Sequence, residues 1–283
     1  MCLHSSVNYF CNYPNSQLTM NTATQRNNVK VIGAGEKTLL FVHGYGCSQN
    51  MWRFMTPNFE QDYKLVLIDL VGSGNSDESA YEKQKYSSLK GYAADVVELC
   101  QELGLEKVYY IGHSVSSMIG VHASLQAPEL FEKLVMIGPS PRYINQGEYF
   151  GGFDKEDIEE LLETLNSNYL GWSSGMAPAI MGNEERPELA DELKNSFCQT
   201  NPEIARHFAE VTFMGDDRQY LDQVTTPTLI LQCQSDVIAP LEVGEFMANS
   251  IQNSTLKVLN ATGHCPHMSA PEETSQAILQ FLN

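Results

Sequence analysis

Short apolar segments alternate with helical segments in two parts of this sequence, and a part without strands separates them. Such alternation predicts a mainly parallel sheet whose two faces are buried by the connecting helices. We expect the strands at Val29–Ile32, Leu39–His43, Lys64–Asp69, Val108–Gly112, Leu134–Gly138, Thr228–Gln232 and Leu256–Leu259. The pattern therefore restricts the chain to the α/β class of folds.

The predicted helices fall into two groups. Those between strands are expected at 89–103, where Gly104 ends the helix, and at Ser114–Gln126, Leu241–Ile251 and Glu272–Phe281. A second group, at Asp154–Asn166, Pro187–Cys198 and Pro202–Met214, lies in the part without strands. We therefore expect a core at residues 20–138 and 226–283 and a helical lid at 139–225.

Composition limits the partners of the chain. Its 35 acidic residues against 17 basic residues give a formal net charge of −18, which argues against nucleic acid or an anionic membrane as partner. No apolar run is long enough to span a bilayer. The seven cysteines are scattered without a CxxC pair, which indicates reduced thiols and a cytoplasmic protein. Residues 1–19 make a poor signal peptide and are expected to form a disordered extension.

The segment Gly112–Ser116 (GHSVS) lies between a predicted strand and a predicted helix. A nucleophile elbow needs this context, because a tight turn lifts the serine hydroxyl above the sheet. Small flanking residues are required where strand and helix approach, and Gly112 and Ser116 meet that need. Ser114 is therefore predicted as a nucleophile, against the alternative that it only caps a helix.

A serine nucleophile needs hydrogen-bond donors for the oxyanion that forms on attack. One donor is expected from the backbone N–H of Val115, directly after the nucleophile. The other is expected from Tyr45, because Gly44–Gly46 follows the strand Leu39–His43. A plain glycine turn is the alternative, and His43 is interpreted as a support for this loop.

The expected chain order for this fold is serine, then acid, then histidine. His264 follows the last strand on a Thr-Gly-His loop and is the predicted base; His267 is its rival, whereas His122 and His207 are expected to be structural. Asp236 follows the strand Thr228–Gln232 and is the predicted acid that orients the imidazole. The weaker candidates for the acid, in or beside the predicted lid, are Asp216, Asp217 and Asp222.

Motifs for cofactor chemistry do not occur in the sequence. There is no phosphate-binding P-loop motif, and Gly33–Gly35 lacks the third glycine and the helix of a dinucleotide fingerprint. The pair His264 and His267 with Cys265 is thin support for a metal site. We therefore expect no cofactor and no metal.

Three longer segments carry a resemblance to a known family: residues 43–52 (HGYGCSQNMW), 112–120 (GHSVSSMIG) and 263–271 (GHCPHMSAP). They resemble the RsbQ-like α/β-hydrolases, which include bacterial stress-response regulators and the plant karrikin and strigolactone receptors. The likeness runs from about residue 24 to the C-terminus and includes the segments 168–172 and 177–178.

The resemblance implies a core hydrolase domain with a V-shaped lid of four helices over a deep apolar pocket. In that pocket, Trp172, Met176 and Phe213 would contact a small hydrophobic ester or lactone, with Tyr45 and Val115 at its base. Ordinary packing of the lid is the alternative for these three side chains. Met176 departs from the plant receptors, which carry an aromatic residue there. The resemblance also implies a regulatory protein partner, such as a PAS-domain phosphatase.

Two functions remain open from the sequence. The first is a slow serine hydrolase that acts as a ligand sensor in a signalling or stress-response pathway. The second is a general metabolic carboxylesterase or lactonase without a signalling partner. Rapid multiple turnover would favour the second function.

Overall fold

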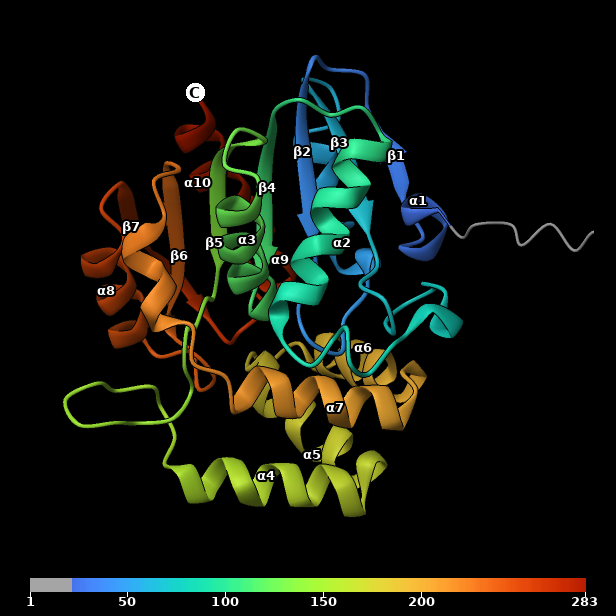
Figure 1. Cartoon of the computed structure of the whole chain (residues 1–283). Helices are drawn as coiled ribbons and strands as arrows, with labels where there is room; N and C mark the ends of the chain where they lie inside the picture. Colours follow the sequence, from blue (N-terminus) through green and yellow to red (C-terminus); the bar gives the residue numbers. More distant parts are fainter. Residues whose placement is uncertain (1–21) are drawn as a thin grey trace, which may run out of the picture.

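The computed structural model describes residues 22–283, so the extension expected at residues 1–19 lies outside the described residues. Its centre is a seven-stranded sheet with the strand order β1-β3-β2-β4-β5-β6-β7 (Figure 1). Only β1 runs antiparallel, against β3, and the other neighbouring strands are parallel. The strands are β1 (Lys30–Ile32), β2 (Lys37–Val42), β3 (Tyr63–Ile68), β4 (Val108–His113), β5 (Phe131–Ile137), β6 (Thr228–Ser235) and β7 (Ser254–Thr262).

Both faces of the sheet are buried, because side chains of alternate residues in each strand pack in opposite directions. In β2, Leu40 and Val42 pack toward α2 (Leu89–Glu102), α3 (Val115–Gln126) and α8 (Leu241–Ser250). On the other face, Leu39 and Phe41 pack with residues of α10 (Pro271–Leu282), with Trp52 of the helical turn η1 (Gln49–Trp52), and with Met55 and Phe59 on either side of η2 (Thr56–Asn58). The central strands are therefore largely apolar on both faces, whereas the edge strands β1 and β7 are partly exposed.

Four further helices, inserted between β5 and β6, form a separate layer beyond one end of the sheet (Figure 1). They are α4 (Lys155–Ser167), α5 (Tyr169–Met181), α6 (Pro187–Gln199) and α7 (Pro202–Phe213). Asp154 and Asp157 form a capping box that starts α4, and the Asn201 side chain caps α7. The apolar faces of these helices share one hydrophobic cluster, which includes Leu165, Leu193 and Ala209.

The clearest difference from the sequence prediction is α5. Residue spacing did not predict this helix, because Gly171 and Gly175 weaken helical propensity and Pro178 lies inside it. Strand β6 continues three residues beyond its predicted end, to Ser235. Short helices also form at α1 (Ala23–Arg26), η3 (Glu78–Ala80), η4 (Arg218–Gln223) and α9 (Pro266–Ser269). Within residues 22–283, no helix has the length and apolar character needed to cross a membrane.

Candidate active site

Ser114 stands at the junction of β4 and α3 with backbone angles φ of 56° and ψ of −125°. A positive φ is strained for a residue that has a Cβ, and such strain is typical of a nucleophile elbow. The turn is close enough that a Cβ added at Gly112 would lie 2.6 Å from the carbonyl oxygen of Ser116. The local sequence therefore forms the sharp turn that the GHSVS segment predicted.

A continuous hydrogen-bond chain joins the three side chains predicted as nucleophile, base and acid. The Nε2 atom of His264 lies 2.8 Å from Ser114 Oγ, and its Nδ1 atom lies 2.7 Å from Asp236 Oδ2. All three side chains are buried. Since a carboxylate only accepts, Nδ1 carries the proton and Nε2 is the acceptor for the serine hydroxyl.

Asp236 is itself held in place by the backbone. Its Oδ1 atom accepts hydrogen bonds from the N–H groups of Ile238, at 2.8 Å, and Ala239, at 3.2 Å. These two bonds fix the orientation of the carboxyl group, so that its Oδ2 atom faces the His264 ring. The loop after β6 therefore supplies both the predicted acid and the backbone groups that hold it in place.

The other candidate residues are engaged elsewhere. His122 Nε2 lies 2.8 Å from Asp217 Oδ1, and His207 Nδ1 lies 2.6 Å from the hydroxyl of Tyr81. Asp216 forms ion pairs with two arginines, at positions 142 and 218. None of these contacts involves Ser114.

The loop after β2 is oriented by the ring of His43. The backbone N–H of Leu70 donates to His43 Nε2 at 3.0 Å, so the ring proton is on Nδ1, which donates to the carbonyl of Gly44 at 2.8 Å. The N–H of Cys47 donates to the same carbonyl at 3.2 Å. The N–H of Tyr45 belongs to the same peptide group as the Gly44 carbonyl, and in a planar trans peptide the two point in opposite directions. The Tyr45 N–H therefore points away from His43 Nδ1 and from the Cys47 N–H.

The second expected donor, the N–H of Val115, belongs to the first residue of α3 and has no acceptor within the helix. The loop at Gly44–Gly46 packs directly on the turn at Ser114, since a Cβ added at Gly44 would lie 2.5 Å from His113 Nδ1 and 3.1 Å from Ser114 Cβ. Burial lowers the pKa of His43, which keeps this ring neutral.

Ser116 has a contact that the sequence did not reveal. It was interpreted only as a small residue in the place of the usual glycine of the elbow. Its buried hydroxyl donates to the carbonyl of His43 at 2.5 Å, and the hydroxyl of Tyr110 donates to the Ser116 carbonyl at 2.7 Å. The helix that carries the Val115 N–H is thereby tied to the loop that carries the Tyr45 N–H.

Ser114 and His264 open into a cavity of about 30 Å³ between the core and the inserted helices. Of the five residues expected there, Tyr45, Trp172, Met176 and Phe213 contribute to its wall, whereas Val115 does not. The ring of Tyr45 lies at the centre of this group, 6.2 Å from the Trp172 ring and 5.9 Å from the Phe213 ring. The Tyr45 hydroxyl is used to hold α7, since it donates to the Ala205 carbonyl at 3.0 Å.

Sequence reasoning missed most of the remaining wall. This wall contains no lysine, arginine, aspartate or glutamate. The missed residues are His113, Tyr143, Leu161, Ile180, Leu193, Phe197, Thr212 and Ile238. Helical spacing marked Leu193, Phe197 and Thr212 only as positions on helices, whereas the loop residue Tyr143 had no signal at all.

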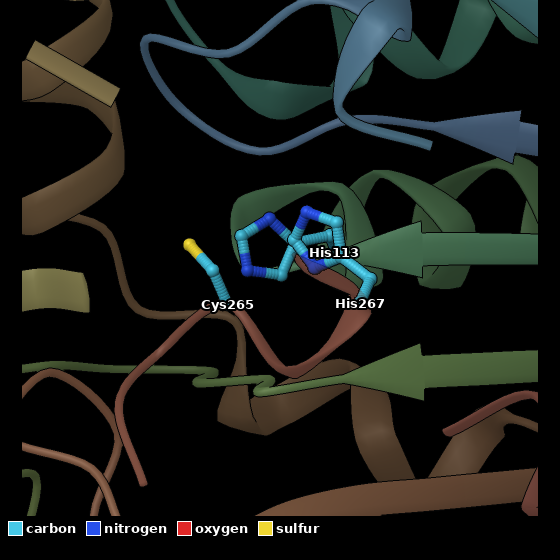
Figure 2. A group of neighbouring side chains, drawn as sticks. All are labelled: His113, Cys265 and His267. Carbon is cyan, nitrogen blue, oxygen red and sulfur yellow. The ribbon is translucent and has the colours of Figure 1, made fainter. Parts of the chain in front are cut away.

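His113, Cys265 and His267 form a cluster of neighbouring side chains (Figure 2). Their potential ligand atoms lie within 4.8 Å of one another, and all three side chains are buried. Burial raises the pKa of the Cys265 thiol well above its usual value and lowers the pKa of His267 to about 3, so the cluster is neutral. To bind to Cys265, a metal ion would have to displace the proton of the thiol, and the raised pKa of this thiol opposes that displacement.

Within this cluster, His113 also holds the histidine loop. Its Nε2 atom donates to the backbone carbonyl of His264 at 2.8 Å, and its ring lies 4.3 Å from the ring of His267. His267 in turn packs on Trp52, with 4.7 Å between the ring centroids. His267 thus has the supporting position expected of it and makes no hydrogen bond to Ser114 or Asp236.

The family model of the alpha/beta hydrolase fold matches residues 37–271. The solved structure of olei00960, a hydrolase from Oleispira antarctica, is similar with a TM-score of 0.90 and 44% identity, covering 92% of this chain and 96% of that chain.

Curated relatives cover nearly the whole chain as well. The karrikin insensitive 2 receptor CA of Petunia hybrida is 36% identical, over 93% of this chain and 98% of that protein. The strigolactone esterase D14 of Arabidopsis thaliana is 35% identical, over 90% of this chain and 96% of that protein. The chain therefore belongs to the alpha/beta hydrolase fold family and is related to the plant karrikin and strigolactone receptors.

Proposed function

We propose that this protein is a serine hydrolase for a small hydrophobic ester or lactone, and that it works slowly enough to serve as a ligand sensor. One observation carries the proposal: the hydrogen-bond chain from Asp236 through His264 to Ser114 ends at an apolar cavity. The relatives named as receptors and as esterases support both parts of the proposal.

The proposed reaction follows the geometry of the site. Ser114 Oγ attacks the ester or lactone carbonyl while His264 Nε2 takes its proton, and the Tyr45 and Val115 N–H groups receive the oxyanion. His264 then gives the proton to the leaving oxygen as the carbon–oxygen bond breaks. Water, deprotonated by His264, attacks the acyl-enzyme, and Ser114 recovers its proton. Asp236 stabilises the imidazolium in both steps.

The size of the cavity supports slow turnover. The volume of about 30 Å³ is about tenfold below the 300–1,000 Å³ that is usual for ligand pockets. We therefore expect the wall to rearrange when a lactone enters, through its side chains or through the inserted helices. A movement of the helices would slow turnover and change the outer surface of the lid, which is what a sensor requires.

Covalent labelling tests the nucleophile. A serine-directed phosphonate should add its mass to the peptide that contains Ser114, and Ser114→Ala should abolish the labelling. Labelling that persists in the variant, or that falls on another residue, would refute the assignment.

Kinetics separate the sensor from the general esterase. A sensor should show a burst of about one product per protein followed by slow turnover, whereas a metabolic carboxylesterase or lactonase should turn over many small esters quickly. Steady multiple turnover without a burst would refute the sensor and leave the hydrolase.

A signalling role also needs a protein partner, for which a PAS-domain phosphatase is our candidate class. The exposed acidic face of α4, with Glu156, Glu159, Glu160 and Glu163, favours a partner with a basic surface. Binding of such a partner should strengthen with ligand and weaken at high salt. Binding that is indifferent to ligand would refute the sensor role.

A further inference from the structure

Three polar atoms in the wall of the cavity lack hydrogen-bond partners within residues 22–283: Tyr143 Oη, Trp172 Nε1 and Thr212 Oγ1. All three side chains are buried, with exposed fractions of 2%, 4% and 5%. Buried polar atoms are normally paired, and an unpaired one opposes folding. Three in one small cavity therefore need an explanation beyond packing.

Thr212 is the most informative of the three. It lies on α7, where a threonine hydroxyl ordinarily donates to the carbonyl four residues earlier, here that of Phe208. The Thr212 hydroxyl makes no such bond, although Ser173 and Ser174 make it on α5. Thr212 thus keeps an available donor at the cavity wall.

Tyr143 approaches the same cavity from the loop after β5. Its ring packs edge-on against Phe213, with 5.0 Å between centroids, and its hydroxyl lies close to the hydroxyl of Ser114. Burial raises the pKa of Tyr143, and the interaction with the Ser114 hydroxyl offsets only part of this shift, so the phenol stays a neutral donor. Trp172, on α5, adds an indole N–H, which can only donate.

The chemistry of the wall defines what would pair these atoms. It contains no lysine, arginine, aspartate or glutamate, so a charged ligand has no counterion there. The three free groups are donors, and the hydroxyls can also accept. A fourth unpaired atom, His113 Nδ1, faces Gly44 and is not counted, since a Cβ at Gly44 would lie 2.5 Å from it.

We propose that Tyr143, Thr212 and Trp172 form a second hydrogen-bonding subsite, and that the ligand is an uncharged ester or lactone with an oxygen acceptor in addition to the reacting ester group. The inference rests on the proposed hydrolase function and narrows its substrate class. A purely hydrocarbon acyl chain would leave the three donors unpaired and would be the poorer substrate.

A matched pair of esters tests the subsite: 4-nitrophenyl methoxyacetate and 4-nitrophenyl butyrate, which differ by an oxygen in place of a methylene. Thr212→Val keeps the shape of the side chain and removes its hydroxyl, and Tyr143→Phe does the same for the phenol. Each change should lower kcat/KM for the methoxyacetate by about tenfold, the loss of one buried hydrogen bond. The same changes should lower kcat/KM for the butyrate much less, so that the ratio of kcat/KM values, methoxyacetate over butyrate, falls.

Comparison of each variant with the wild type on the same ester cancels the difference in intrinsic reactivity. Ile238→Val, an apolar change in the same wall, is the control and should alter both esters by the same factor. Equal losses on both esters in Thr212→Val and Tyr143→Phe would overturn the subsite.

Measurements of binding distinguish failure of the proposed subsite from failure of the proposed hydrolase function. In a Ser114→Ala background, calorimetry should give a lower Kd for the methoxyacetate than for the butyrate, and Thr212→Val should remove this preference. If the wild type hydrolyses neither ester, the proposed function fails, whereas the ratio of the two Kd values still decides the subsite. Equal Kd values before and after the substitution would overturn it.

Discussion

The two walls of the cavity differ in how their polar groups are used. On the core side, the groups of Ser114, His264 and Asp236 bond to one another, and the loop around His43 is held by Leu70 and Ser116. On the side of the inserted helices, Trp172 and Thr212 leave polar atoms unpaired. The paired groups of Ser114, His264 and Asp236 hold the proposed chemistry in one geometry, whereas the unpaired groups of Trp172 and Thr212 leave selection of the ligand to the insert.

The two walls are joined at the histidine loop. The N–H of His264 donates to the carbonyl of Ile180, in the last turn of α5, at 2.8 Å. Asn183 Nδ2, just after α5, donates to the carbonyl of Thr262 at 2.8 Å. Movement of α5 would therefore reach the backbone of the proposed base without any intermediate residue.

The largest expected effect comes from removing the nucleophile on the core side. Ser114→Ala should lower kcat by about 10⁴–10⁶-fold, because the rest of the triad has nothing to activate. Ligand affinity should change little, since the insert wall remains. Hydrolysis assays paired with calorimetry would check this, and a parallel loss of affinity would contradict the division of labour between the walls.

Gly263→Ala should disturb the contact between α5 and the loop that carries His264. Gly263 has a φ of 87°, and a Cβ there would lie 1.8 Å from the carbonyl oxygen of Met181, so α5 and the histidine loop must separate. We expect kcat to fall about 100-fold, the scale of a displacement near 1 Å at a catalytic group.

Gly104→Ala serves as the control for the strain of positive φ, because its φ is 63° and no atom lies within 4 Å of an added Cβ. It should lower stability and leave kcat unchanged. Equal loss of kcat in both variants would show that strain, and not the junction, is responsible.

Ser116→Ala should have a smaller effect on the core wall. Without its bond to the His43 carbonyl, the Tyr45 and Val115 donors lose their link, and we expect kcat to fall about tenfold with KM little changed. Ser124→Ala removes another buried hydroxyl bond, to the Val121 carbonyl, from the same helix. An equal fall of kcat in both variants would remove the positioning role of Ser116.

A fall in pH should lower the stability of the folded protein through its buried histidines. The pKa of His267 is lowered to about 3 by burial, and the pKa of His113 is lowered well below its usual value. Below about pH 6.5 the unfolded chain binds protons that the folded chain does not, so stability falls as the pH falls toward 3.

Each such proton adds about 1.4 kcal/mol per pH unit to this slope. Urea unfolding between pH 7.5 and 4.5 measures the slope, and His267→Asn should reduce it by the share of one proton. An unchanged slope would mean that His267 is protonated in the folded state.

Local sequence carried enough information for the fold and for the order of the triad. Apolar runs define strands, and the small residues of GHSVS define the elbow, because both depend on neighbours in the chain. The positions of His264 and Asp236 after successive strands followed from the rule that strand ends gather at one edge of a parallel sheet. Helix α5 was not predicted, because its glycines and Pro178 oppose helix formation locally. Packing against α6 and α4 stabilises it in the folded protein.

By itself, then, the sequence determined the parallel sheet, the elbow at Ser114 and the residue types available for catalysis. Only the tertiary structure decided which hydroxyls are paired: Ser116 with a carbonyl 73 residues away, and Tyr143 and Thr212 with none among the described residues. The reason is physical. Strands and turns are set by nearby residues, whereas the pairing of a buried polar atom depends on surfaces that meet only when distant segments pack.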